Sequence, residues 1–426
     1  MDIYTVKAGD SIWKIAKAYG VSPERIITDN AIANPEQLVI GQALLILSPK
    51  VVHKVRAGET LADIAQQYQT TALTLVQNNP TLINDPTLNP GRILTISFTD
   101  RKIRTISVNG YAYPDIRRNI LVHALPYLTT LSIFSYGFTT EGALIPIEDE
   151  PLIELAQQFS VAPIMVLSSI TEKGTFEGSH ANKLFRDEQM QNTLFPRIIE
   201  TMQKKGYYGL DVDFEYIAAE DREAYLQFLR NIADVLHENG FFLHVDLAPK
   251  ISASQPGTLY EGHDYQQIGR IADTVLLMTY EWGYTYGPPM AIAPLDKVQE
   301  VVQYAVSEIP RSKILLGIPN YAYDWTLPFV KGVSSAKGMG NEAAVLLAAN
   351  NNASIDFDTV AQSPHFTYWD SKWLEHVVWF EDVRSIRAKL ELMTNYQLAG
   401  VSYWNVMQPF TQNWLLVNAL YQIRKL

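Results

Sequence analysis

The sequence predicts an α/β protein in which a (β/α)8 TIM barrel follows two small βααβ modules. Two observations predict this arrangement: the first hundred residues contain a repeat, and the remaining chain alternates short apolar runs with helical patterns. The predicted domains are modules at 1–48 and 51–98 and a barrel at 101–426, with a small α+β insertion at about 322–380. A chain of 426 residues that is 47% hydrophobic and 19% charged has enough apolar residues for cores of this size.

The two modules are predicted from a repeat with an offset of 49 residues. The segment YTVKAGDSIW, which begins at Tyr4, matches HKVRAGETLA, which begins at His53. In each copy a Gly-acid-hydroxyl turn supplies a helix N-cap, and apolar residues then fall on one helical face. The matched pairs are Gly9 and Gly58, Ser11 and Thr60, Ile15 and Ile64, Ala16 and Ala65, Tyr19 and Tyr68, Asn30 and Asn79 and, after a one-residue insertion, Gly41 and Gly91, and Ile46 and Ile96. Each copy predicts strand, helix, helix, strand.

Eight short runs predict the barrel strands, and longer amphipathic segments predict helices between them. The runs are 103–109, 131–137, 162–169, 207–215, 241–249, 274–282, 313–321 and 398–406. Helices are predicted at 182–205, 219–239, 293–309 and 381–396, with a closing helix at 412–424. Several runs are almost continuously apolar, as is typical of strands buried on both faces. A doubly wound open sheet is the alternative, which is weakened because no Gly-rich phosphate loop follows the first run.

The segment between the seventh and eighth runs is far longer than a helical crossover requires. It contains FTYWD and VVWFED ahead of the helix at 381–396. We therefore expect the small α+β insertion to lie over the end of the barrel where active sites are found.

Three carboxylates alternate along the fourth run, in the sequence Asp211-Val212-Asp213-Phe214-Glu215. Because side chains on a strand alternate between its faces, the three carboxylates share the face that points into the barrel. Glu215 lies at the carboxyl end of the strand, and the two aspartates lie deeper. Three stacked carboxylates cannot all ionise at low cost in a low-dielectric interior, so they must hold or share a proton. Such coupling can keep Glu215 protonated near neutral pH, as a general acid requires.

Composition excludes several classes of function. The chain has no cysteine, which excludes disulfides, thiolate metal sites and a cysteine nucleophile. Its formal net charge is −11, so we expect neither nucleic acid nor an anionic membrane as a partner. The sequence has no run of 18 apolar residues, no secretory signal at its start and no H-E-x-x-H motif. We expect a monomer that uses no metal and no cofactor.

The repeat resembles the LysM module, through the start V-x-x-G-[DE]-[ST]-[LI]-x-x-I-A in both copies. LysM modules bind N-acetylglucosamine-containing glycans such as peptidoglycan and chitin, so the resemblance implies such a partner. It implies contacts from the loop after the first strand, which is Gly9, Asp10, Ser11 and Ile12 in the first module and Gly58, Glu59, Thr60 and Leu61 in the second. It also implies contacts from loops around 31–34 and 80–83. The alternative is that the modules are inert spacers. They are electrically neutral, with eight basic and eight acidic residues up to residue 98, so hydrogen bonding and stacking should dominate.

The last two-thirds of the chain resembles glycoside hydrolase family 18, the chitinase-like enzymes. Their D-G-x-D-x-D-x-E signature reads YGLDVDFE here, with Tyr208 in place of the first aspartate, which puts any role of that aspartate in doubt. Their M-x-Y-D motif reads MTYE at 278–281, with Glu for Asp. The last strand carries SYWN, and the resemblance makes Trp404 the floor of the −1 sugar site. The S-x-G-G of the third strand is replaced at 167–169 by LSS, so that wall of the cleft should differ.

The resemblance also implies a role for each acidic residue. Glu215 would protonate the glycosidic oxygen, and the acetamido group of the −1 sugar would attack C1 to give an oxazolinium ion. Asp213 would orient that acetamide, Asp211 would share a proton with Asp213, and Tyr280 would hydrogen-bond the acetamide oxygen. Further cleft candidates, each of which has an ordinary core or surface role as its alternative, are Glu281, Trp282, Tyr136 and Asn320. His244 is predicted to be a core residue with satisfied hydrogen bonds.

Two LysM modules ahead of such a barrel resemble the bacterial spore cortical fragment-lytic enzymes, which are N-acetylglucosaminidases that act on spore peptidoglycan during germination. This resemblance implies a spore location, at the coat or cortex surface, reached without a classical signal peptide. Three alternatives stay open: a chitinase or endo-N-acetylglucosaminidase that acts on another polymer, a catalytically inactive lectin-like protein, and a structural spore-coat component.

Overall fold

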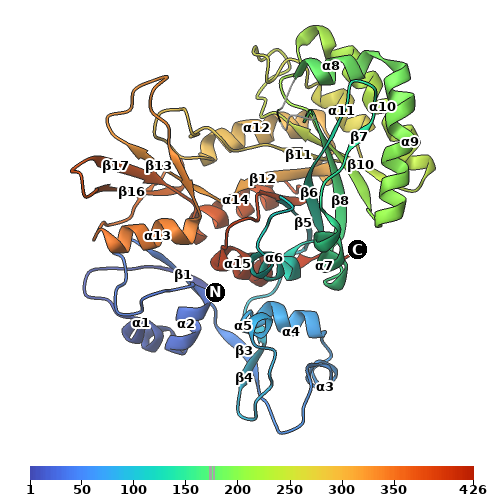
Figure 1. Cartoon of the computed structure of the whole chain (residues 1–426). Helices are drawn as coiled ribbons and strands as arrows, with labels where there is room; N and C mark the ends of the chain where they lie inside the picture. The colour runs from blue at the N-terminus through green and yellow to red at the C-terminus, as the bar shows by residue number, and fades with distance from the viewer. Residues whose placement is uncertain (172–174, 176–177) are drawn as a thin grey trace.

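Eight parallel strands close into a barrel, as the sequence predicted (Figure 1). The computed structural model describes residues 1–171, 175 and 178–426. Closure is complete because β5 pairs with β18 on one side and with β6 on the other, so the alternative of an open sheet is wrong. The barrel strands, in order around the barrel, are β5 (Thr105–Ala112), β6 (Thr130–Phe138), β8 (Ala162–Ser168), β9 (Gly209–Asp213), β10 (Phe242–Leu247), β11 (Thr274–Leu277), β12 (Ile314–Pro319) and β18 (Gly400–Trp404).

Helices surround the barrel and separate most of its strands. They are α6 (Arg118–Ala124), α7 (Glu150–Gln158), α8 (Gly178–Arg186), α9 (Glu188–Lys205), α10 (Arg222–Glu238), α11 (Tyr265–Ile271), α12 (Leu295–Glu308), α14 (Val383–Asn395) and α15 (Thr411–Leu420), with 3-10 turns at Leu125–Tyr127, Ala219–Asp221 and Arg311–Lys313. None of the described helices is both long and apolar enough to cross a bilayer.

Two predicted helices differ from the observed ones. The helix predicted at 182–205 is divided into α8 and α9, because the Asp187 side chain accepts a hydrogen bond from the Met190 N–H (3.0 Å) and caps the start of α9. The closing helix ends at Leu420, earlier than predicted. The chain then continues as β19 (Gln422–Ile423), which pairs with β5 outside the closed barrel.

The long segment after β12 forms an α+β subdomain, as predicted. Its five-stranded antiparallel sheet has the order β14-β13-β17-β16-β15 and is accompanied by one helix. These elements are β13 (Ala322–Thr326), β14 (Lys337–Met339), α13 (Asn341–Asn350), β15 (Asp356–Asp358), β16 (Ser363–Trp369) and β17 (Glu375–Trp379). A short strand elsewhere, β7 (Leu144–Ile145), pairs with the end of β6.

Both N-terminal modules have the predicted βααβ order, and each pairs its two strands antiparallel. The predicted N-caps form: Ser11 Oγ accepts from the Lys14 N–H (3.3 Å), and Thr60 makes a capping box with Asp63. A short helix before the last strand of the second module was not predicted. The elements are β1 (Asp2–Thr5), α1 (Ile12–Tyr19), α2 (Pro23–Asp29), β2 (Ala43–Ile46), β3 (Pro49–Lys54), α3 (Leu61–Gln67), α4 (Ala72–Asn78), α5 (Thr81–Asn84) and β4 (Ile93–Phe98).

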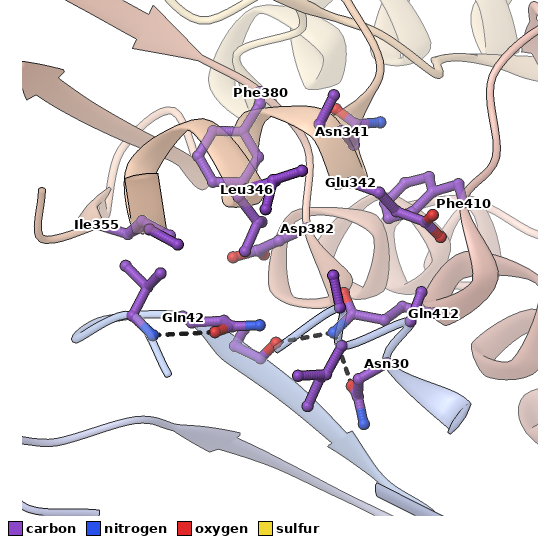
Figure 2. A pocket seen from close by; sticks show the side chains of 18 of the residues that line it. Asn30, Gln42, Asn341, Glu342, Leu346, Ile355, Phe380, Asp382, Phe410 and Gln412 are labelled. Atoms are coloured by element: carbon purple, nitrogen blue, oxygen red, sulfur yellow. Dashed lines mark hydrogen bonds between the residues drawn. The ribbon is translucent and has the colours of Figure 1, made fainter. Parts of the chain in front are cut away.

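The first module is packed firmly against the α+β subdomain. The Ile355 N–H donates to the Ile40 carbonyl (2.9 Å), and the Gln37 side chain donates to the Ala349 carbonyl (2.9 Å). Val39 belongs to the apolar core of the subdomain. A cavity of about 370 Å³ lies between the module and α13 and is shown in Figure 2. The loop at 31–34, predicted to contact glycan, lines this cavity.

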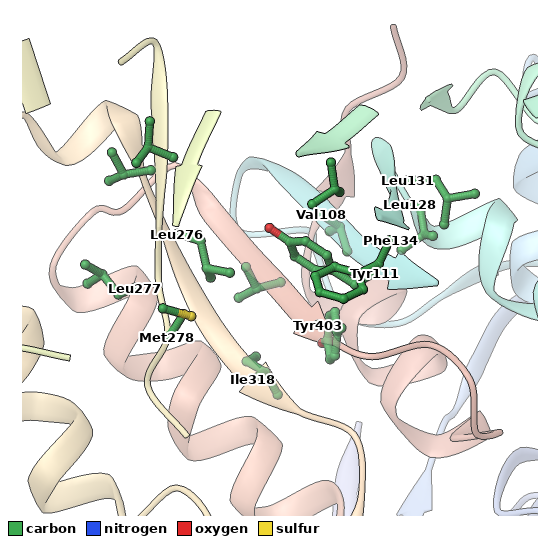
Figure 3. Close-up of a cluster of buried hydrophobic side chains, with 14 of the residues drawn as sticks. Val108, Tyr111, Leu128, Leu131, Phe134, Leu276, Leu277, Met278, Ile318 and Tyr403 are labelled. Atoms are coloured by element: carbon green, nitrogen blue, oxygen red, sulfur yellow. The ribbon is translucent and has the colours of Figure 1, made fainter. Parts of the chain in front are cut away.

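Apolar residues from the barrel and its helices form one large core. Figure 3 shows part of it, with Tyr111 on β5 and Phe134 on β6 among aliphatic side chains such as Val108 and Leu131. The ring of Tyr111 is completely buried, although it carries a hydroxyl group. A buried hydroxyl needs a hydrogen-bond partner, and the partners of Tyr111 lead to the candidate site.

Candidate active site

The three carboxylates of the fourth barrel strand lie in the order the sequence predicted. Asp211 is fully buried, Asp213 is 9% exposed, and Glu215 is exposed just beyond the end of β9. Between them, Phe214 points the other way and contacts Phe185 on α8 (ring centroids 5.5 Å apart). We call Asp211, Asp213 and Glu215 the acidic ladder. It runs from the barrel interior to its carboxyl end, where the strands of this fold present catalytic groups.

Two neighbouring hydroxyls hold the deepest carboxylate. The Tyr111 hydroxyl donates to Asp211 Oδ2 (2.6 Å), and the Ser132 hydroxyl lies 3.3 Å from the same atom. The Tyr111 hydroxyl also contacts both carboxylate oxygens of Asp246 on β10, at 2.8 and 2.9 Å. Asp246 is buried and was missed by the sequence analysis. The signal available was the alternation of His244 and Asp246 in FFLHVDLAP, which places both on the inward face of a strand.

Burial and mutual repulsion govern the ionisation of this group. Burial raises the pKa of Asp213 well above its usual range, and the charges of Asp246, Glu215 and Asp211 raise it further. Burial also raises the pKa of Asp211, although the charge of His244 and the hydroxyl donors oppose the rise. Asp213 Oδ1 is buried and has no hydrogen-bond partner among the described residues, so this oxygen is available to a substrate group.

Glu215 combines access to solvent with a raised pKa. Its side chain is exposed, yet the surrounding protein limits its hydration, and this desolvation raises the pKa of the carboxyl. The charge of Glu281 raises it further. Glu281 is itself fixed by the hydroxyls of Tyr321 and Tyr323, the latter at 3.1 Å. A carboxyl that is accessible to solvent and has a raised pKa has the properties of a general acid.

Tyr280, Trp404 and Trp282 are the other residues predicted to belong to the cleft. Tyr280 follows β11 at the carboxyl end of the barrel. Burial raises the pKa of Tyr280 well above its usual range, and the charges of Asp246 and Asp213 add to the rise. The partly exposed Trp404 ring packs 5.1 Å from the Phe134 ring and 5.4 Å from the Tyr111 ring (centroid distances). Trp282 is partly buried against the barrel core.

Two of the predicted cleft residues do not reach the cleft. Tyr136 is fully buried, and its hydroxyl donates to Asp149 (2.5 Å). An irregularity in strand register between Ile133 and Tyr136 reverses the alternation that would have pointed Tyr136 inward.

Asn320 is 1% exposed. Its amide donates to the carbonyls of Asn405 and Gln408 at 2.9 Å each, so it fixes the loop after β18. The structure therefore corrects both residues to supporting roles, because their polar groups are already bonded within the protein.

His244 also differs from the prediction of a satisfied core residue. Its Nδ1 bonds the Thr274 hydroxyl (2.7 Å), but its Nε2 is buried without a hydrogen-bond partner among the described residues and lies 3.4 Å from Asp246 Oδ1. Asp211, His244 and Asp246 bring ligand-type atoms within 4.8 Å of one another. The Tyr111 hydroxyl already bridges the two carboxylates, and we interpret the group as hydrogen-bonded side chains.

The loop after the first strand of each module is largely committed to internal bonds. Asp10 accepts hydrogen bonds from the Tyr4 hydroxyl and the Lys7 N–H (2.7 Å each), and Glu59 contacts His53 Nε2 (2.8 Å). Ile12 is completely buried, so its side chain cannot contact a glycan. Its counterpart Leu61 is partly exposed, and so is Ser11. Thr60, Gly9 and Gly58 are exposed.

Comparison with known families identifies the class of the protein. The family described as glycosyl hydrolases family 18 matches residues 130–408, and the LysM domain matches residues 4–46 and 53–97. The chain belongs to glycosyl hydrolase family 18 and carries two LysM domains. It is a glycosidase.

Individual relatives match over the whole length of the chain. It is 38% identical over 430 residues to the cortical fragment-lytic enzyme of Bacillus anthracis, covering 100% of this chain and 99% of that protein. The crystal structure of the Bacillus cereus spore cortex-lytic enzyme SleL matches with a TM-score of 0.84 and 38% identity, covering 100% of this chain and 98% of that one. The Bacillus megaterium SleL structure matches with a TM-score of 0.84 and 37% identity, covering 99% of this chain and 98% of that one.

Proposed function

We propose that this glycosidase hydrolyses N-acetylglucosaminyl linkages in spore cortex peptidoglycan, or in fragments of it, and acts in spore germination at the coat or cortex surface. The observation that carries the proposal is the acidic ladder: an exposed Glu215 with a raised pKa, above an Asp213 whose buried oxygen is free to bind. The full-length similarity to cortical fragment-lytic enzymes supports the choice of substrate. The LysM domains would hold the glycan and need no charge to do so.

The proposed mechanism is substrate-assisted and retains the anomeric configuration. Glu215 donates its proton to the glycosidic oxygen, and the acetamido carbonyl of the −1 sugar attacks C1. The attacking group is part of the substrate, so its effective concentration is high. Asp213 accepts a hydrogen bond from the acetamide N–H and stabilises the positive charge of the oxazolinium ion. Glu215, now a carboxylate, then removes a proton from the water that opens the ring.

Three neighbours support these steps. Asp211, whose carboxylate is bonded to Tyr111 and Ser132, shares a proton with Asp213. The Tyr280 hydroxyl, just beyond the carboxyl end of β11, hydrogen-bonds the acetamide oxygen. Trp404 offers its partly exposed ring as the floor for the −1 sugar. The alternative of a lectin-like protein is disfavoured because the general acid and its supporting carboxylates are all present.

Replacement of Glu215 by Gln tests the proposal. The E215Q protein should lose hydrolysis of cortex fragments by at least 10²-fold, the lower range for a positioned general acid, while it still binds insoluble peptidoglycan. An N-acetylglucosamine thiazoline, which mimics the oxazolinium ion, should inhibit the wild-type enzyme. Unchanged turnover in E215Q would refute the assignment of the acid. An active enzyme that the thiazoline does not inhibit would refute substrate assistance.

The nature of the polymer needs a separate measurement. Mass spectrometry of the products from purified cortex fragments and from chitin oligomers should show N-acetylglucosamine released from cortex at much the higher rate. Faster cleavage of chitin would favour the second candidate, a chitinase with the same chemistry.

A further inference from the structure

One hydroxyl group at the base of the ladder faces three carboxylate oxygens. The Tyr111 hydroxyl lies 2.6 Å from Asp211 Oδ2 and 2.8 and 2.9 Å from the two oxygens of Asp246. A hydroxyl has a single proton to donate, and an ionised carboxylate only accepts. If both aspartates were ionised, one of them would face the lone pairs of the hydroxyl in a dry interior. One of the two must therefore carry a proton and donate it to Tyr111.

The surroundings assign that proton to Asp246. Asp211 faces a second hydroxyl, that of Ser132, and can therefore be stabilised as an anion. Among the described residues, Tyr111 is the one hydrogen-bond donor to Asp246, because His244 Nε2 lies 3.4 Å from Asp246 Oδ1 without forming a hydrogen bond. The proton of Tyr111 is needed by Asp211. Burial raises the pKa of Asp246 well above its usual range, and the charge of Asp211 adds to the rise, which agrees with this assignment.

We propose that Asp246 is a further positioning residue of the active site, an un-ionised carboxyl that donates to Tyr111 so that Tyr111 donates to ionised Asp211. This chain of hydrogen bonds fixes Asp211 beneath Asp213. Because Asp246 stays neutral, it adds no further negative charge to the buried end of the ladder. The proposal rests on the proposed hydrolysis for its catalytic consequence, but the protonation of Asp246 stands on the geometry alone.

A cavity at the opposite end of the barrel gives this proton a route to solvent. The cavity, of about 480 Å³, opens among the first residues of the barrel strands and is lined by His244, Thr274 and Ser132. His244 bonds Thr274 through Nδ1 and turns its unpartnered Nε2 toward Asp246, so the imidazole can pass a proton between the cavity and the carboxyl. Proton exchange at Asp246 would then continue while a glycan covers Glu215.

The titratable groups that interact with Asp246 come from several elements. On the barrel strands and just beyond them they are Tyr111 of β5, Asp211 and Asp213 of β9, Glu215 beyond its end, His244 of β10 itself and Tyr280 beyond β11. Tyr225 of α10 also interacts with Asp246, from the helix layer outside the barrel. His244 is the only potential cation in this set, and burial lowers its pKa, so no fixed positive charge compensates an ionised Asp246.

Two variants of Asp246 separate a neutral carboxyl from an ionised one. Asp246→Asn stays neutral and keeps a donor for Tyr111, so kcat should stay within about threefold of wild type and the pH profile should not move. Asp246→Leu has no donor, so kcat should fall by about tenfold or more with little change in KM, as expected for loss of one hydrogen bond that supports a charged group. A kcat in Asp246→Asn as low as in Asp246→Leu, or a displaced pH profile in Asp246→Asn, would overturn the proposal.

Infrared spectroscopy tests the proton without any substrate. At a pH where ordinary aspartates are ionised, the wild-type protein should show carbonyl stretches of un-ionised carboxylic acids, to which Glu215 and Asp213 also contribute. Asp246→Asn should lose the component that comes from Asp246, so the summed band should weaken. Persistence of the full band in Asp246→Asn would overturn the proposal, whatever the outcome of the Glu215 experiment. If Asp246→Leu fails to fold, the kinetics and the infrared band of Asp246→Asn still test whether Asp246 is protonated.

The same band tests the route through the cavity. In D2O, exchange of the carboxyl proton should slow in His244→Phe, whose ring fills the site without a nitrogen. His263→Phe provides the matched control, because His263 is a buried histidine that does not line this cavity. Unchanged exchange in His244→Phe would refute the route.

Discussion

The matched glycines of the two LysM domains allow a sharp test of how the first domain is attached. Gly41 and Gly91 occupy equivalent positions and have similar left-handed backbones, with φ of +85° and +94°. A Cβ added at Gly41 would lie 1.8 Å from the Ile355 carbonyl oxygen, whereas a Cβ at Gly91 would meet nothing nearer than the Lys54 side chain, at 3.9 Å. Alanine at either position introduces the same backbone strain, but only at Gly41 does it collide with the α+β subdomain.

The difference in cost follows from these contacts. The strained backbone costs about 1 kcal/mol in both variants. To reach an ordinary contact distance, Gly41→Ala must move the module away from Ile355 by about 1.5 Å. This displacement disrupts the Ile355–Ile40 bond (2.9 Å), the Gln37–Ala349 bond (2.9 Å) and the bond from Arg384 to the Gly41 carbonyl (3.2 Å). At about 1 kcal/mol each, these three bonds bring the cost of Gly41→Ala to about 4 kcal/mol.

Hydrogen exchange and denaturant unfolding measure this difference. Gly41→Ala should increase amide exchange in the segment 31–42, in β2 and in α13, and should lower the free energy of unfolding by about 3 kcal/mol more than Gly91→Ala. Turnover of a short soluble glycan should not change, since an added Cβ at neither glycine contacts the acidic ladder. Equal destabilisation by the two variants, or unchanged exchange in α13, would refute the rigid attachment of the first domain.

Two further predictions concern the carboxyl end of the barrel and the residues around it. Glu281→Gln removes a negative charge that raises the pKa of Glu215, so this pKa should fall. The alkaline limb of the kcat/KM profile should then move to lower pH. A limb that stays in place or moves to higher pH would contradict the assignment of Glu215 as the acid. Tyr136→Phe removes a buried hydrogen-bond donor to Asp149, so the free energy of unfolding should fall by about 1–3 kcal/mol. The KM for cortex fragments should stay unchanged. An increase in KM would show that Tyr136 contacts the substrate after all.

Local periodicity explains why so much of the fold could be predicted. The alternation in Asp211-Val212-Asp213-Phe214-Glu215 depends only on the geometry of one strand, and the structure has the carboxylates inside and Phe214 outside. The N-caps at Ser11 and Thr60 depend on three or four consecutive residues, and both form. Where a local irregularity interrupts the pattern, as in the register shift before Tyr136, the same reasoning gives the wrong face.

The sequence by itself determined the eight strands, the two βααβ repeats and the order of the acidic ladder, because each is encoded by neighbours within a few residues. Only the tertiary structure brought Tyr111, Asp211 and Asp246 together, since they come from three strands that meet only when the barrel closes. Closure also places these groups out of reach of water, where a carboxyl must be paired or protonated. The number of protons at the base of the ladder is therefore a property of the closed barrel.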